Sequence, residues 1–356
     1  MTSFLSSLAV AAATAVAFGL LIVIHELGHF LAARLSGMRV DRFSVGFGPV
    51  VWSRRRGDSE WALSAVPLGG YVKIAGMAPG EDVAEGDLGA YCHQPAWRRF
   101  LVILAGPAAN YLLAVVLAVA LIATLGLREP DPAPVVGEVV PGGAAERAGL
   151  APGDRVVSAA GQPIATWAAL VSAVRAHPGV DLALEVRRAG ASPDSPPVRI
   201  MTRPEDSNGI GRVGMAPHLV ALRAGPLEAL AAGFERTNER AGEILSGLAQ
   251  VASRKQKAEL RGPVGIAEEM AHSARAGVGP FLMMVWLISI MLALFNFLPL
   301  PALDGGRLVF LAYEMVTRRP VNQKVEGVVH FVGFMALLGL LVAVTIFGDL
   351  ARLLRH

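Results

Sequence analysis

Two histidines and a glutamate lie within five residues of each other in the segment Val23–Ala32, VIHELGHFLA. On an α-helix, residues i and i+4 share a face, so His25 and His29 can bind one cation together. This H-E-x-x-H spacing is a signature of zinc hydrolases. Zinc acidifies a water, and the carboxylate of Glu26 would take its proton so that the oxygen can attack a carbonyl carbon. The motif therefore predicts zinc-dependent hydrolysis with Glu26 as the general base.

The surroundings of this motif strengthen that interpretation. The pattern alone occurs by chance in roughly one chain in a hundred of this length. Here, however, it ends a segment without a charged side chain, Met1–Ile24. Ionisable residues within a membrane-spanning helix are costly and mark functional sites by default. Isolated histidines such as His93 and His330 are instead expected to be structural.

A catalytic zinc needs three protein ligands and an open position. Asp304 is the candidate third ligand, because it ends the uncharged run Ala276–Leu303 and follows Pro299 and Pro301. Prolines break a helix, and irregular backbone at membrane depth is tolerated only where it is buried in protein or lines a cavity. The alternative role for Asp304 is a helix N-cap outside the bilayer. Asn296, in the same stretch, is a candidate for binding a substrate backbone or an oxyanion.

The elements that position these residues are predicted from composition. The chain has 356 residues, of which 53% are hydrophobic and only 17% charged, whereas soluble domains carry about 25% charged residues. A membrane-spanning helix needs about 20 apolar residues. Four uncharged runs reach that length: Met1–Ile24, Phe100–Leu127, Ala276–Leu303 and Gly327–Gly348. The first is expected to be retained rather than cleaved as a signal peptide, because no Lys or Arg precedes Arg34.

The distribution of basic residues predicts the orientation. Beyond the first span at 1–35, eight lie before the second run, and four lie between the last two runs: Arg39, Arg42, Arg54, Arg55, Arg56, Lys73, Arg98 and Arg99, then Arg307, Arg318, Arg319 and Lys324. By the positive-inside rule both connections are cytoplasmic, and both termini and the segment 128–275 are extracytoplasmic. The basic residues Arg254, Lys255 and Lys257 do not alter this, because long loops translocate largely regardless of charge. The single cysteine, Cys92, excludes an internal disulfide, and no nucleic-acid partner is expected.

Between the runs, the sequence predicts further elements. Residues 36–96 alternate apolar and polar residues between Gly and Pro, which indicates short strands and turns. Residues 133–220 are typical of a small soluble domain, with a helix near Trp167–Ala176 and a strand at Asp181–Arg188. Pro226–Leu260 is an amphipathic helical stretch, which would lie at the outer membrane interface or pack on the neighbouring domain.

The predicted fold is a membrane α-helical protein of about four transmembrane helices, with a cytoplasmic-side β-element and an inserted extracytoplasmic α+β domain. The expected boundaries are transmembrane helix 1 at 1–35, the β region at 36–96, transmembrane helix 2 at 97–127, the inserted domain at 133–220, an amphipathic segment at 221–275, transmembrane helix 3 at 276–317 and transmembrane helix 4 at 326–352.

The inserted domain resembles a PDZ domain of the bacterial protease type, through AERAGLAPGDRVVSAAGQPI with its Gly-Leu and Pro-Gly-Asp turn. The resemblance implies a groove in which an extended peptide adds to a sheet edge. The alternative is a PDZ-like spacer that binds nothing.

HELGH in the first run, LPLPALDGG in the third and the inserted domain together resemble the site-2 protease family of intramembrane zinc metalloproteases. The nearest branch is that of bacterial regulators of sigma-E-type stress responses. The resemblance implies that His25, His29 and Asp304 bind Zn²⁺, that Glu26 is the general base and that Asn296 contacts substrate. A site of this kind would leave the choice between zinc and another divalent ion open, although zinc is the usual occupant.

Three further segments carry the same resemblance. GFGP (Gly46–Pro49) is similar to the family's membrane-associated β-element, and AGPAANYLLA (Ala105–Ala114) to part of its second span. PLGGYVKIAG (Pro67–Gly76) is similar to the strand that pairs with an unwound substrate helix. That similarity assigns substrate contacts to Gly69, Gly70, Tyr71, Val72 and Lys73.

The implied activity is cleavage of single-span proteins within the bilayer of the bacterial inner membrane, after a first extracytoplasmic cut. The implied partners are an anti-sigma factor or the remnant of a signal peptide, with the PDZ domain contacting substrates or filtering them by size. The chain is long enough for one PDZ domain, whereas the best-known enterobacterial member has two. A membrane-anchored PDZ scaffold with a structural metal is the rival hypothesis, and a zinc transporter is disfavoured because the sequence has no second metal cluster or repeat.

Overall fold

The computed structural model describes residues 2–78, 80–84, 86–192, 195–207, 209–222, 224–253 and 262–346. The chain forms two compact units, which we call the helical unit (residues 1–122 and 227–356) and the inserted unit (residues 123–226). The end of the expected amphipathic stretch at Leu260, the basic residues Arg254, Lys255 and Lys257, and the end of the last run after residue 346 lie outside the described residues.

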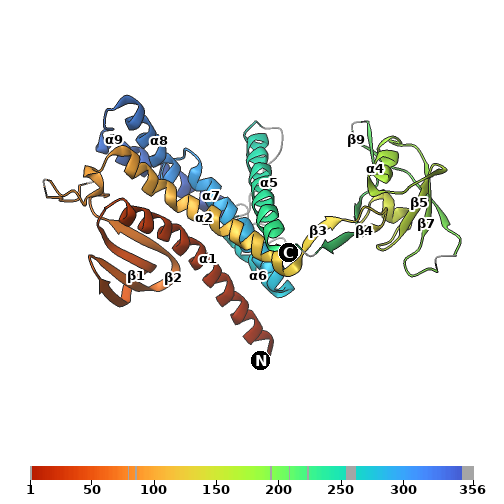
Figure 1. Cartoon of the computed structure of the whole chain (residues 1–356), viewed down its shortest axis with the longest axis horizontal. Helices are drawn as coiled ribbons and strands as arrows, with labels where there is room; N and C mark the ends of the chain where they lie inside the picture. The colour runs from red at the N-terminus through yellow and green to blue at the C-terminus, as the bar shows by residue number, and fades with distance from the viewer. Residues whose placement is uncertain are drawn as a thin grey trace. The chain divides into compact units, whose positions relative to one another are not determined.

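The helical unit contains seven helices, two strands and a short 3-10 helix in its described part (Figure 1). In chain order these are α1 (Thr2–Leu35), β1 (Val40–Arg56), β2 (Ser59–Ile74), the 3-10 helix Tyr91–His93, α2 (Ala96–Leu125), α5 (Pro226–Ala252), α6 (Pro263–Ala276), α7 (Val278–Phe297), α8 (Asp304–Thr317) and α9 (Gln323–Ala343).

Four of its helices are long and apolar enough to cross a membrane, which confirms the expected number of spans. They are Leu8–Leu35, Ala96–Leu125, Val278–Phe297 and Lys324–Ile346. The range 276–317, expected as one span, instead holds two helices, α7 and α8. The backbone between them, Leu298–Leu303, is irregular because the two prolines there cannot continue the helix.

Small residues allow the membrane-spanning helices to pack closely. A side chain at Gly28 of α1 would overlap the Ala105 carbonyl of α2, so the two backbones touch there. Ser289 of α7 donates a hydrogen bond to the Asn110 carbonyl of α2 at 2.8 Å. Close approach of backbones and interhelical hydrogen bonds are the main sources of helix association in lipid. Helices α1, α2 and α7 therefore form the frame of the unit (Figure 1).

Strands β1 and β2 form an antiparallel sheet beside α1. Phe43 of β1 lies opposite Trp61 at the start of β2 and opposite Val72 near its end, so the first half of β1 lies between the two halves of β2. In the described part of the chain, the segment Gly70–Ile74 is thus an outer strand of this sheet. Gly69, with φ of +132°, makes the bend that begins this outer strand.

Helix α5 confirms the helical prediction for the amphipathic stretch. Thr237 on α5 is fully buried and accepts a hydrogen bond from Trp286 Nε1 of α7 at 3.2 Å. Asn238 accepts one from the Tyr111 hydroxyl of α2 at 2.6 Å. Phe234, on the same helix, is 53% exposed. One face of α5 therefore packs on the helical unit, and the other presents apolar side chains.

The inserted unit is a small α+β domain. Its elements are β3 (Leu127–Pro130), β4 (Val136–Val139), α3 (Ala144–Arg147), β5 (Arg155–Ala159), β6 (Gln162–Pro163), α4 (Trp167–Arg175), β7 (Leu182–Arg187), β8 (Val198–Thr202), β9 (Glu205–Ser207), β10 (Ile210–Arg212), β11 (Met215–Pro217) and β12 (Leu219–Leu222). The predicted helix and strand are confirmed within a residue by α4 and β7. The core lies between α4 and the sheet β6-β5-β7-β8, around Val156, Leu170 and Leu184.

Candidate metal centre

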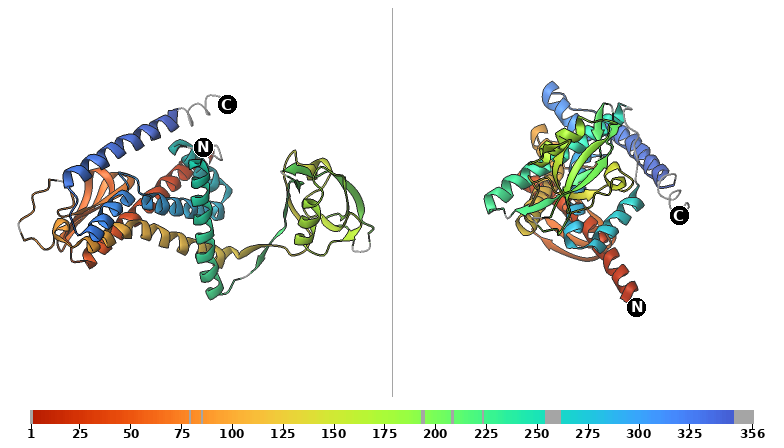
Figure 2. Two further views of the ribbon diagram at one scale, coloured as in Figure 1. Left: turned by 90° about the horizontal axis from the view of Figure 1, so that it is seen from above. Right: turned by 90° about the vertical axis from the view of Figure 1, so that its right-hand side faces the viewer.

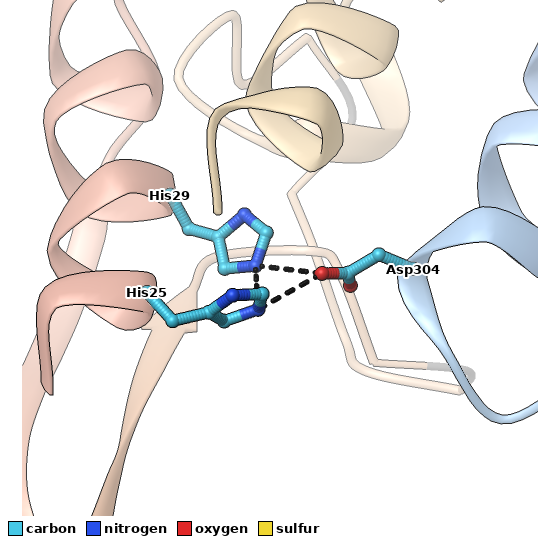
Figure 3. A group of neighbouring side chains, drawn as sticks. All are labelled: His25, His29 and Asp304. Carbon is cyan, nitrogen blue, oxygen red and sulfur yellow. Dashed lines mark hydrogen bonds and ion pairs between the residues drawn. The ribbon is translucent and has the colours of Figure 1, made fainter. Parts of the chain in front are cut away.

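His25, His29 and Asp304 come together at one point of the helical unit (Figure 3). The Nε2 atoms of the two histidines are 3.2 Å apart. Asp304 Oδ2 lies 2.9 Å from Nε2 of His25 and 3.2 Å from Nε2 of His29. The histidines are one turn apart on α1 and the aspartate is the first residue of α8, so two elements separated by most of the chain supply the three atoms.

This donor set fits a zinc ion. Ligands about 2.0–2.2 Å from a tetrahedral zinc are about 3.4 Å from one another, close to the separations of 2.9–3.2 Å found here. Asp304 Oδ2 is buried and accepts no hydrogen bond within the described ranges. Three electron-rich atoms facing one another in a buried place need a cation between them. Among the described residues, these three side chains form the group that could hold a metal ion. Three protein ligands are typical of a catalytic zinc.

A carbonyl of α2 orients His29. His29 is buried, and its Nδ1 lies 2.8 Å from the Val102 carbonyl, to which it donates. The proton is therefore on Nδ1, and Nε2 is free to bind a metal. Pro107 lies inside α2 just beyond this turn. Because proline has no N–H, Pro107 cannot donate the usual helical hydrogen bond to the Ile103 carbonyl, next to Val102.

An amide of α2 lies beside His25. Asn110 is buried, and its amide nitrogen Nδ2 is 3.4 Å from His25 Nδ1. Asn110 Oδ1 has no hydrogen-bond partner in the described part of the chain. Metal binding through Nε2 of His25 requires the amide orientation in which Oδ1 accepts from Nδ1–H. This role of Asn110 was not predicted from the sequence, although the residue lies in the segment Ala105–Ala114 that carried the family resemblance.

Gly106 lets α2 pass directly over the imidazoles. A Cβ at this position would overlap His29 Nε2 and lie 2.9 Å from His25 Nε2. Only a glycine leaves this space open. The role of Gly106 was not predicted, because a glycine within a helix does not reveal which neighbour lies against it.

Asp304 is not a helix cap. The N-cap residue of α8 is Leu303, and no side chain caps the helix there. Behind Asp304, a side chain at Gly305 would overlap the Leu298 carbonyl, and one at Gly306 would lie 2.6 Å from that of Leu300. The two glycines thus let the irregular segment fold tightly onto α8, which directs the carboxylate toward α1.

Glu26 and Asn296 line the same cavity as the three ligands. The cavity has a volume of about 560 Å³ and is also lined by Val72 and His330. Glu26 Oε2 accepts a hydrogen bond from the Val72 backbone N–H at 3.0 Å. Asn296 Nδ2 donates to the Leu292 carbonyl of its own helix at 3.0 Å. The Glu26 carboxylate and the Asn296 amide therefore both lie beside the His25, His29 and Asp304 group.

The five residues expected to contact substrate are not equivalent. Only Val72 lines the cavity. At position 70 the packing itself requires a glycine, because a Cβ there would lie 2.6 Å from the Ser44 carbonyl. Gly69 forms the bend described above. Tyr71 accepts a hydrogen bond from Arg42 at 3.3 Å, and Lys73 lies 3.5 Å from Glu81.

A membrane helical fold, a buried His₂Asp group and an adjacent glutamate define a membrane-embedded metallohydrolase. The sequence model of peptidase family M50 matches residues 13–340. The chain is 32% identical to zinc metalloprotease RasP of Geobacillus kaustophilus, over 95% of this chain and 96% of that protein. It is 30% identical to the regulator of sigma-E protease RseP of Escherichia coli (99% and 100% covered) and 31% identical to RseP of Salmonella typhimurium (96% and 98%).

The chain therefore belongs to peptidase family M50, the site-2 proteases. It is a multi-pass membrane protein and a zinc metalloendopeptidase that acts within the membrane.

Proposed function

We propose that this protease cleaves single-span membrane proteins inside the bilayer after a first cut outside it, with His25, His29 and Asp304 as zinc ligands and Glu26 as general base. The observation that carries the proposal is the convergence of these three side chains from α1 and α8, at 2.9–3.2 Å, in a cavity that Glu26 also lines.

Each residue then has a distinct task in the reaction. When bound, zinc supplies an acidified water and polarises the scissile carbonyl. Glu26 holds the proton taken from that water and delivers it to the leaving nitrogen. Asn296 binds a substrate carbonyl through its amide after releasing the Leu292 carbonyl. The Val102 carbonyl accepts from Nδ1 of His29 and so leaves its Nε2 for the metal. Asn110 would do the same for His25 once its amide is turned so that Oδ1, and not Nδ2, faces Nδ1.

The outer strand Gly70–Ile74 offers a way to hold an unwound substrate. A peptide bond inside an intact helix is shielded, so the substrate must unwind, and its backbone then needs new partners. A strand edge supplies them by β-addition. The Val72 N–H on this edge donates to Glu26 in this structure, and Val72 lines the cavity of the proposed metal site. Pairing with substrate would release Glu26 for its role as a base.

The inserted unit would act as a PDZ domain. A cavity of about 500 Å³ lies between α4 and the strands β4, β10 and β11. Its lining combines apolar side chains with two arginines: Val140, Trp167, Val171, Ile210, Met215, Arg175 and Arg212. Such a groove suits an extended peptide with a hydrophobic side chain and a carboxylate.

The orientation follows from the positive-inside rule. We place the inserted unit and both termini outside the cytoplasm and the protein in the bacterial inner membrane. The name of the Escherichia coli relative, a regulator of sigma-E, supports a membrane-bound anti-sigma factor as the substrate here. A signal-peptide remnant has the same single-span chemistry.

The test is turnover of a single-span model substrate by Glu26→Gln protein in reconstituted membranes. We expect cleavage to fall at least about a hundredfold, the usual contribution of a general base, with zinc content unchanged. Glu239→Gln, at an exposed position of α5, is the matched control and should cleave normally. Unchanged turnover by the Glu26 variant would refute the mechanism.

A further inference from the structure

Helix α9 contacts the ligand-bearing segment through a single face. Figure 2 shows α9 (dark blue) standing apart from the other helices over most of its length. Its apolar span contains no buried residue. Two residues of α9, one turn apart, meet the segment that leads into Asp304. His330 bonds to Ala302, and a side chain at Gly333 would overlap Pro301. Both contacts are with the segment Leu298–Leu303 that leads into Asp304.

The hydrogen bond to Ala302 determines the state of the His330 ring. The backbone N–H of Ala302 donates to His330 Nδ1 at 2.9 Å. A nitrogen that accepts a hydrogen bond carries no proton, so the ring is neutral with its proton on Nε2. Nε2 is buried and has no hydrogen-bond partner in the part of the chain that the structure describes. The one hydrogen bond of the ring in the described part of the chain is therefore that of Nδ1, to the ligand segment, while the Phe310 ring packs beside it at 5.9 Å between ring centroids.

The donated N–H belongs to a residue in a strained conformation. Ala302 has φ of +73°, in the left-handed region that non-glycine residues avoid. Such a conformation is costly for a residue with a Cβ and persists only when its surroundings hold it. On the other side of Asp304, a Cβ at Gly306 would lie 3.2 Å from His330 Cε1. The imidazole thus contacts the backbone both before and after the ligand.

We propose that His330 is a positioning residue of the metal centre, which holds the segment Leu298–Leu303 so that the Asp304 carboxylate meets the two imidazoles of α1. The role rests on the proposed assignment of Asp304 as a ligand. It differs from the expectation that an isolated histidine in this helix is only structural. It also makes the position of the fourth span a condition for a complete metal site.

Two variants test the hydrogen bond separately from the bulk of the ring. His330→Asn places Oδ1 where Nδ1 lies, so it keeps an acceptor for the Ala302 N–H. His330→Leu fills the space without an acceptor, and His330→Gln places its acceptor near Nε2 instead. Val328→Asn is the control for the effect of placing an amide side chain in α9, because Val328 is 62% exposed on the same helix.

The first measurement is hydrogen exchange of the Ala302 and Leu303 amides in the metal-free protein. We expect faster exchange in the Leu and Gln variants, and exchange close to that of the parent protein in His330→Asn and Val328→Asn. The second is zinc retention against a chelator. We expect about 10–100-fold weaker retention in the Leu and Gln variants, as for other residues that orient a metal ligand, and less than about threefold in the other two.

Parent-like exchange and zinc retention in the Leu and Gln variants would overturn the proposal, as would faster exchange with unchanged retention. If His330→Leu does not fold, His330→Gln carries the comparison, because it keeps the size and polarity of the ring. Asp304→Ala, measured alongside, separates the two proposals. Zinc retention unaffected by Asp304→Ala would refute the ligand assignment itself, and with it any positioning role for His330.

Discussion

Asp154 of the inserted unit and Asp304 of the helical unit are both acids with little exposure, 1% and 18% of the side chain. Asp154 Oδ2 accepts from the Ala151 N–H at 2.9 Å and from Arg188 at 2.6 Å. Asp304 Oδ2 accepts no hydrogen bond within the described residues, and the nearest groups are two imidazole nitrogens.

The difference separates the structural carboxylate of Asp154 from the ligand role that we propose for Asp304. The charge of Asp154 is balanced by donors that the chain supplies. Its role is therefore structural: it holds the turn Ala151–Asp154 in the core of the inserted unit. The charge of Asp304 is balanced only when a cation is added. Burial alone therefore does not indicate function, whereas burial without sufficient donors does.

The largest expected effect is that of Asp304→Ala on the metal. Removing one of the three proposed ligands should weaken zinc retention by more than about a hundredfold, beyond the effect of losing an orienting residue, and should abolish cleavage of a single-span substrate. The folding of the inserted unit should not change. Metal analysis of the purified protein and cleavage in proteoliposomes measure the two effects. Normal zinc content in this variant would contradict the assignment of Asp304 as a ligand.

Asp154→Ala should have the opposite profile. It leaves donors without their acceptor, and we expect it to lower the free energy of unfolding of the inserted unit by about 3 kcal/mol. Zinc retention should be unchanged. Hydrogen exchange of the core amides of β5 and β7 in the intact protein measures this. The control is Asp181→Ala, whose side chain is 69% exposed and which should cost less than about 0.5 kcal/mol.

Gly106→Ala sharpens the comparison without removing a ligand. The new methyl group would overlap His29 Nε2, so α2 or the imidazole must move, and we expect zinc retention to weaken about tenfold. Gly339→Ala in α9 is the matched control, because a Cβ there meets nothing within 4 Å. Equal zinc retention in the two variants would show that α2 does not constrain the site.

The smallest effect is expected for Thr166→Ala at the start of α4. The Thr166 hydroxyl accepts from the Ala169 N–H at 3.2 Å as the N-cap of that helix, so its loss should cost about 1 kcal/mol of unfolding free energy. Ser172→Ala, which removes a hydroxyl within the same helix, should cost less. Hydrogen exchange of the core amides of β5 and β7 measures this loss as well. Zinc retention should be the same as in the parent protein.

The four spans, the H-E-x-x-H pair and the break before Asp304 could be predicted from the sequence. Each depends on neighbours along the chain: apolar length, the i,i+4 spacing of His25 and His29, and two prolines that cannot continue a helix. The order of α4 and β7 likewise follows from local patterns.

What only the tertiary structure decided is which groups complete the site. The Val102 carbonyl that orients His29 is 73 residues away in sequence, and Asn110 is 85 residues from His25. His330, expected to be structural, bonds to Ala302 across 28 residues. A carbonyl, an amide or a glycine has no distinctive spacing in a sequence. Its role appears only when helix packing brings it against a ligand, because hydrogen bonds and steric exclusion act over a few ångströms in space and not along the chain.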